Sequence, residues 1–114
     1  MEALEFERLE RIARNLPVWK GTLKLTTVQT EFGPVYMAFG KGYSSGSEFG
    51  PVSWHGVYAI NYGQIKGMCR PCEANGDATE QAMQQSMLDD AVWFMRHMAD
   101  RDMNAPDYKL SGNA

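Results

Sequence analysis

Two cysteines and two histidines are the residues of this chain best suited to metal or redox chemistry. Zinc sites in proteins take four nitrogen or sulfur ligands in a tetrahedron, and a C-x-x-C spacing lets two thiolates reach one ion. The chain offers one such set, formed by Cys69, Cys72, His55 and His97. Because both histidines lie far in sequence from the Cys-Arg-Pro-Cys segment, we expect no metal at these residues.

The cysteine pair has two other interpretations. A redox dithiol needs its first cysteine at a helix N-terminus, where the helix dipole stabilises the thiolate, but residues 73–76 separate the pair from the next predicted helix. Two ordinary reduced thiols in a cytosolic protein need no such setting, and this is the interpretation that we expect.

Catalytic arrangements of side chains are not evident along the chain. His55 shares a predicted strand face with Ser53, but the sequence has no nucleophile-elbow pattern and no close carboxylate pair in a recognisable setting. The glycine- and serine-rich segment 40–51 lacks the G-x-x-x-x-G-K-[ST] spacing of a phosphate-binding loop, and it precedes a strand rather than a helix. The sequence therefore predicts a protein that is not an enzyme.

Segment 40–51 is predicted to be a mobile surface loop, because four of its twelve residues are glycine, three are serine and one is proline. Tyr43 and Phe49 would stand on this loop as candidate contacts with a protein partner. The five residues 31–35 recur as residues 48–52, and both copies precede a predicted strand. This repetition indicates one strand-entry turn used twice, with glycine supplying a free φ.

The elements that must position these residues follow an α-β-β-β(-β)-α order. Hydrophobic spacing predicts a helix over 2–16, ended by Pro17, and a second helix that begins near Asp77 or Thr79. Alternating apolar residues predict strands over 22–30, 35–39 and 52–61, with a short fourth strand over 64–68. We expect one α+β domain over 1–103, in which an antiparallel β-meander packs one face against both helices, and a flexible tail over 104–114.

The second predicted helix carries more apolar surface than one small sheet can cover. Its main stripe consists of Met83, Met87, Ala91, Phe94 and Met98, and a second apolar stripe lies beside it. Trp93 stands on the flank, and Trp and Met are enriched at protein interfaces. We therefore predict that Trp93, Phe94 and His97 lie at a partner interface, with a twofold homodimer as the first expectation. The competing interpretation places Trp93 in the core, covered by the first helix.

Composition and charge limit the class of partner. The 114 residues carry 11 Lys+Arg against 14 Asp+Glu, a net charge of −3, and residues 73–114 hold 8 acids against 3 bases. Nucleic acid is thus not the expected partner, although double-stranded-RNA-binding domains share the α-β-β-β-α order. The strand aromatics Tyr36, Trp54, Tyr58 and Tyr62 could stack on bases if one sheet face were open. No apolar run is long enough to span a membrane, and the N-terminus is too charged for a signal peptide, so we expect a cytoplasmic protein.

These observations favour a small intracellular binding protein without catalytic activity, which acts by docking on a protein partner. A regulator or inhibitor directed at a host system, of the kind that phages and mobile elements encode, fits this profile. The alternative is a small nucleic-acid- or zinc-binding module that uses the strand aromatics and the Cys69/Cys72 pair.

Overall fold

The computed structural model describes residues 2–43, 48, 50–62 and 65–99, and it confirms an α+β fold. In chain order the elements are α1 (Glu2–Ala13), β1 (Lys24–Thr30), β2 (Gly33–Tyr43), β3 (Val52–Tyr62), β4 (Ile65–Asn75) and α2 (Glu80–Ala99). The strands form one antiparallel sheet in the order β1-β2-β3-β4, so β1 and β4 are its edges. Phe49 and residues 104–114 lie outside the described residues, and what was predicted of them stays a prediction.

Local hydrogen bonds mark the C-terminal end of α1 and the N-terminal end of α2. α1 ends at Ala13 rather than at residue 16, and the amide of Leu16 donates to the Ala13 carbonyl in the turn that leads to Pro17. Thr79 caps α2, because its Oγ1 accepts a hydrogen bond of 3.0 Å from the amide of Ala82. Of the two predicted starts of this helix, the one at the threonine is therefore the correct one.

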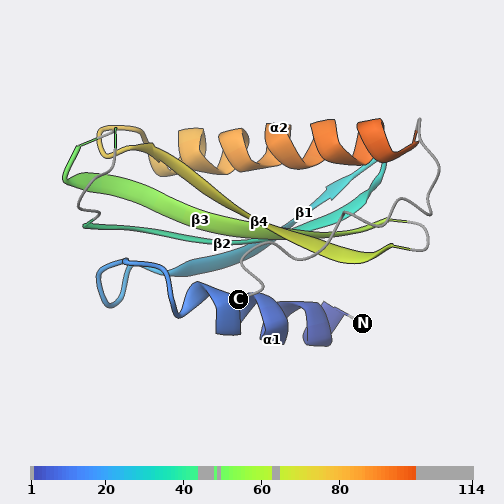
Figure 1. The fold of residues 1–114 in the computed structure, drawn as a ribbon, viewed down its shortest axis with the longest axis horizontal. Coiled ribbons are helices and arrows are strands. Elements are labelled where there is room, and N and C mark those ends of the chain that lie inside the picture. The colour runs from blue at the N-terminus through green and yellow to red at the C-terminus, as the bar shows by residue number, and fades with distance from the viewer. Residues whose placement is uncertain (1, 44–47, 49, 63–64, 100–114) are drawn as a thin grey trace.

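The two helices cover opposite faces of the sheet, with α2 above it and α1 below it in Figure 1. This arrangement corrects the expectation that both helices share one face. Successive residues of a strand point to opposite faces, and on β2 the buried Met37 belongs to the cluster with α2, while the buried Ala38 belongs to the cluster with α1. A sheet with apolar central strands on both sides needs a cover on each side.

α2 packs on the sheet through a buried stripe of four methionines and one alanine: Met83, Met87, Ala91, Met95 and Met98. The predicted stripe is confirmed except at one position. Met95 takes the place expected for Phe94, which lies half-buried at the margin of the stripe. The helix is thus rotated slightly from the predicted orientation, and this rotation brings Phe94 towards β4.

β2 and β4 extend further than predicted. β2 continues to Tyr43, so residues 40–43 belong to a strand and the prediction of a loop was wrong for them. Gly42 lies under the backbone at Pro17, where an added Cβ would collide with the Pro17 carbonyl oxygen. This glycine therefore permits two backbone segments to approach closely and is not a sign of flexibility. β4 runs to Asn75 instead of ending at residue 68, and it takes in both cysteines.

The repeated five-residue segment uses glycine for a free φ in both copies. Gly33 has a φ of 120° where β2 begins, and Gly50 has a φ of 101° shortly before β3. Residues other than glycine rarely adopt such values. In the first copy, Thr30 closes the turn, because its Oγ1 accepts a hydrogen bond of 3.0 Å from the amide of Phe32.

Candidate functional site

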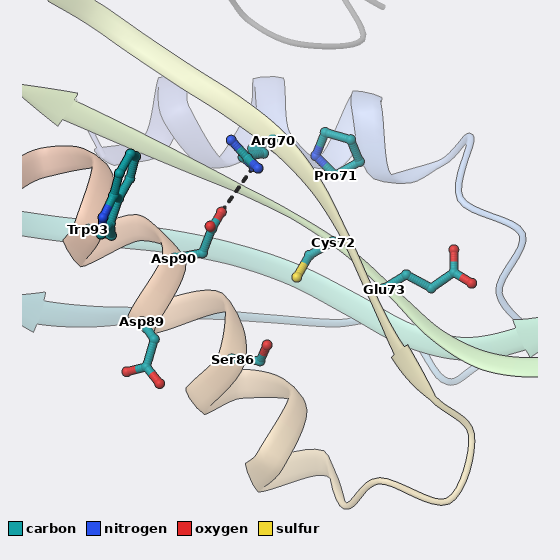
Figure 2. A pocket seen from close by; sticks show the side chains of 8 residues that line it. All are labelled: Arg70, Pro71, Cys72, Glu73, Ser86, Asp89, Asp90 and Trp93. Atoms are coloured by element: carbon teal, nitrogen blue, oxygen red, sulfur yellow. Dashed lines mark ion pairs between the residues drawn. The ribbon is translucent and has the colours of Figure 1, made fainter. Parts of the chain in front are cut away.

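A groove runs between the edge strand β4 and helix α2, on the face of the sheet that α2 covers. α2 packs mainly over the inner strand β3 and makes far fewer contacts with the edge strand β4. Two adjoining hollows of about 510 and 540 Å³ lie there, lined by residues 70–73 of β4 and by α2 side chains from Ser86 to His97. Figure 2 shows the first of them. We call the two hollows together the β4–α2 groove, and Trp93 borders both.

One wall of the β4–α2 groove is a paired network. The Arg70 Nε lies 3.1 Å from the Asp90 Oδ2, and the Tyr58 hydroxyl donates a hydrogen bond of 2.7 Å to the same oxygen. The Arg70 guanidinium also lies over the Phe94 ring, 4.5 Å from its centre. Burial, and then the bond to Asp90, raise the pKa of Tyr58 well above its ordinary value, so this phenol stays a neutral donor. The network holds the wall in one arrangement.

Trp93 stands on this wall as an exposed aromatic side chain. Its ring is stacked on that of His97, with centres 4.9 Å apart and planes 11° apart, and it meets the Phe94 ring edge to face at 5.1 Å. Yet 56 % of Trp93 is exposed. The structure thus brings together three residues that the sequence grouped as an interface, Trp93, Phe94 and His97, and it excludes the alternative that Trp93 lies in the core.

Cys72 lines the first hollow as a protonated, uncharged thiol. Cys72 points towards α2, as Figure 2 shows, and burial raises the pKa of its thiol, with the negative charge of Asp90 adding to the effect. A side-chain hydrogen bond with Ser86 acts in the opposite direction. A raised pKa keeps the thiol protonated, which disfavours the nucleophilic thiolate that redox chemistry needs.

The four candidate zinc ligands do not converge. Cys69 packs in the cluster with α1, whereas Cys72 packs against the cluster with α2, because residues three apart on a strand point to opposite faces. His55 is buried, with its Nδ1 3.9 Å from the Glu73 Oε1, while His97 lies on α2. Among the described residues, no three His, Cys, Asp or Glu side chains gather in a way that could hold a metal ion.

Tyr43, the other described candidate for partner contact, lies away from the β4–α2 groove. It is the last residue of β2, and β3 separates β2 from β4. Its side chain is 62 % exposed and meets the ring of Trp19 edge to face at 6.4 Å. Trp19 was missed from the sequence, because nothing marks residues 14–23 as packing across β2.

The strand aromatics are not available for stacking on bases. Tyr36 is buried beneath α1, and Trp54 and Tyr58 are buried beneath α2, since helices cover both faces of the sheet. The side chain of Tyr62 lies outside the description. The proposed stacking platform is therefore wrong for the three aromatic residues that the structure describes.

No protein-family model, curated protein or solved structure matches this chain. Within the described ranges, neither helix is long and apolar enough to cross a membrane.

Proposed function

We propose that this chain is a binding protein that docks on a protein partner through the β4–α2 groove and catalyses no reaction. The observation that carries the proposal is Trp93, more than half exposed and yet held in one orientation by His97 and Phe94. Trp is enriched among the few residues that dominate binding energy at interfaces, and such residues act as anchors beside pockets. Trp93 borders both hollows of the groove, the one that Ser86 also lines and the one that His97 also lines.

The wall around Trp93 supports docking because it is ordered before a partner arrives. Asp90 is already bound by Arg70 and Tyr58, so a partner need not organise these three side chains. A site that is already ordered loses little conformational entropy on binding. Two adjoining open hollows suit a segment of a polypeptide better than a compact small molecule.

The setting and role of the chain are part of the same proposal. The two cysteines are free thiols on opposite faces of β4, which suits a reducing compartment such as the cytoplasm. A small domain that occupies a partner's surface acts as a regulator or an inhibitor of that partner. We propose that a phage or a mobile element encodes the chain and that its target belongs to the host. A second copy of the chain is the competing occupant of the groove, and sedimentation of the purified protein tests it.

The experiment uses tagged wild-type protein, Trp93→Ala and Trp19→Ala as baits in a cell lysate, followed by mass spectrometry and by binding measurements with the purified partner. Trp19 is the matched control, since it is a second exposed tryptophan that does not line the groove. We expect one stoichiometric protein on the wild type and on Trp19→Ala, with Trp93→Ala binding it at least about 30-fold more weakly, as for an interface hot spot.

Two results would contradict the proposal. A partner that binds Trp93→Ala as tightly as the wild type would place the interface elsewhere, and loss with Trp19→Ala alone would place it at the Trp19–Tyr43 contact. Nucleic acid in the eluate, retained after nuclease-free washing at high salt, would favour the alternative class of function.

A further inference from the structure

One hollow of the β4–α2 groove, the one of about 510 Å³, has an excess of negative charge. Its lining holds one arginine against three carboxylates, a formal charge of −2. Arg70 and Asp90 are paired with each other, so their charges cancel within the wall. The Glu73 carboxylate lies 3.9 Å from the Nδ1 of His55, and Figure 2 shows its side chain pointing away from α2. On the α2 side, the excess negative charge is therefore that of Asp89. Such a hollow attracts a cation.

Within this chain, an acidic and an aromatic side chain four residues apart on α2 already bind an arginine. Asp90 and Phe94 lie four residues apart on α2, and Arg70 engages both, by an ion pair of 3.1 Å and by stacking 4.5 Å from the ring centre. Asp89 and Trp93 repeat this spacing one residue earlier, and both are exposed. Within the part of the chain that the structure describes, no lysine or arginine pairs with Asp89.

We propose that Asp89 and Trp93 receive a basic side chain, an arginine, from an extended segment of the protein partner, an inference that rests on the proposed function. A planar guanidinium can lie against an indole while its N–H groups donate to a carboxylate. His97 covers one face of the indole, so the guanidinium takes the part that borders the hollow. Asp89 is exposed and now accepts a hydrogen bond from Gln85, and a change of rotamer turns it towards the cation.

Pro71 disfavours strand pairing of the partner segment along the middle of β4. An edge strand presents backbone groups that a further strand could join, but proline has no N–H to donate, and Pro71 lies in the body of β4 opposite Val57. In this proposal the side chains of the groove make the recognition, and the charge of the partner side chain decides its specificity.

The test titrates N-acetyl-arginine-N-methylamide into the ¹⁵N-labelled full chain and follows the indole N–H of Trp93 by NMR. Matched glutamine and glutamate derivatives are the controls for charge. We expect saturable shifts at Trp93 with a Kd in the millimolar range, as befits a single side chain, and no saturation with the two controls. Asp89→Asn should weaken the arginine derivative about two- to fivefold, and added salt should do the same.

Glu31→Gln is the matched charge control, because Glu31 is an exposed acid in the turn between β1 and β2, at the other edge of the sheet. Equal shifts from the glutamine derivative, or equal weakening by Glu31→Gln and Asp89→Asn, would overturn the inference. A partner that is lost from Trp93→Ala but binds Asp89→Asn and wild type alike would overturn the inference alone. A partner indifferent to Trp93→Ala would overturn the proposed function as well.

Discussion

Truncation of Trp93 to alanine distinguishes an interface tryptophan from a core tryptophan by its effect on stability. A fully enclosed Trp side chain buries up to about 250 Å². Less than half of Trp93 is covered, so about 100 Å² of contact is lost, worth at most about 2.5 kcal/mol at 25 cal/mol per Å². Residual burial in the unfolded chain and the recovered side-chain entropy both reduce this figure. We therefore expect Trp93→Ala to lower the free energy of unfolding by about 1 kcal/mol.

The matched variant is Met95→Ala, two residues further along the same helix. Met95 is fully buried between α2 and the sheet, and removal of such a side chain costs about 2–5 kcal/mol. Urea unfolding followed by circular dichroism gives both values, with an unchanged m-value as the check on two-state behaviour. A loss of 3 kcal/mol or more for Trp93→Ala would mean that the side chain is enclosed, and it would refute the description of Trp93 as an exposed anchor.

Three further outcomes follow from the structure. Because the pKa of Tyr58 is raised, the folded protein keeps a phenol proton that the unfolded chain releases near pH 10. The free energy of unfolding should therefore fall as the pH rises above about 10, and Tyr58→Phe should make that fall shallower in urea titrations at pH 8 to 11. If the variant and the wild type lost stability equally steeply with pH, the phenol would not be buried as described. The pKa of the Cys72 thiol is also raised, so in the folded protein this thiol should react with iodoacetamide more slowly than in the urea-unfolded chain. Asp90→Asn should accelerate the reaction of the folded protein, because it removes a negative charge near the thiol. Faster reaction in the folded wild type than in urea, or slower reaction in Asp90→Asn, would contradict this environment. Gly42→Ala should lower the melting temperature by roughly 8 °C or more, corresponding to about 2 kcal/mol, because its Cβ would collide with the Pro17 carbonyl oxygen, and a wild-type melting curve would refute that close approach.

The fold could be predicted from the sequence where one local pattern sufficed. Alternation located the strands, and spacing of 3 and 4 residues located α2 and most of its buried stripe, Met83, Met87, Ala91 and Met98. The placement of α1 could not be predicted in this way, because the second apolar face of β2 and β3 is made of small residues and of Tyr36, which alternation alone does not identify as buried. The glycines among residues 40–43 led to the wrong prediction of a loop, because the sequence alone does not show what packs against them. Only the packing of a distant segment shows that Gly42 serves a close approach.

The candidate site could be predicted in part. Trp93, Phe94 and His97 share one flank of one helix, so helical geometry alone groups them. The pairing of Arg70 with Asp90 joins a strand to a helix twenty residues later, and it depends on how far β4 extends and on the rotation of α2. Neither quantity is fixed by local spacing, and the same holds for the contact between Trp19 and Tyr43.

Hydrogen–deuterium exchange of the purified complex, compared with that of the free chain, tests the docking claim most directly. Amide exchange reports which backbone segments a partner covers or stabilises, and the β4–α2 groove predicts slower exchange within residues 70–73 and 86–97 on binding. Residues 17–25 and 41–43, around the Trp19–Tyr43 contact, should exchange as in the free chain. Slower exchange confined to those latter residues, with residues 70–73 and 86–97 unchanged, would contradict docking through the β4–α2 groove.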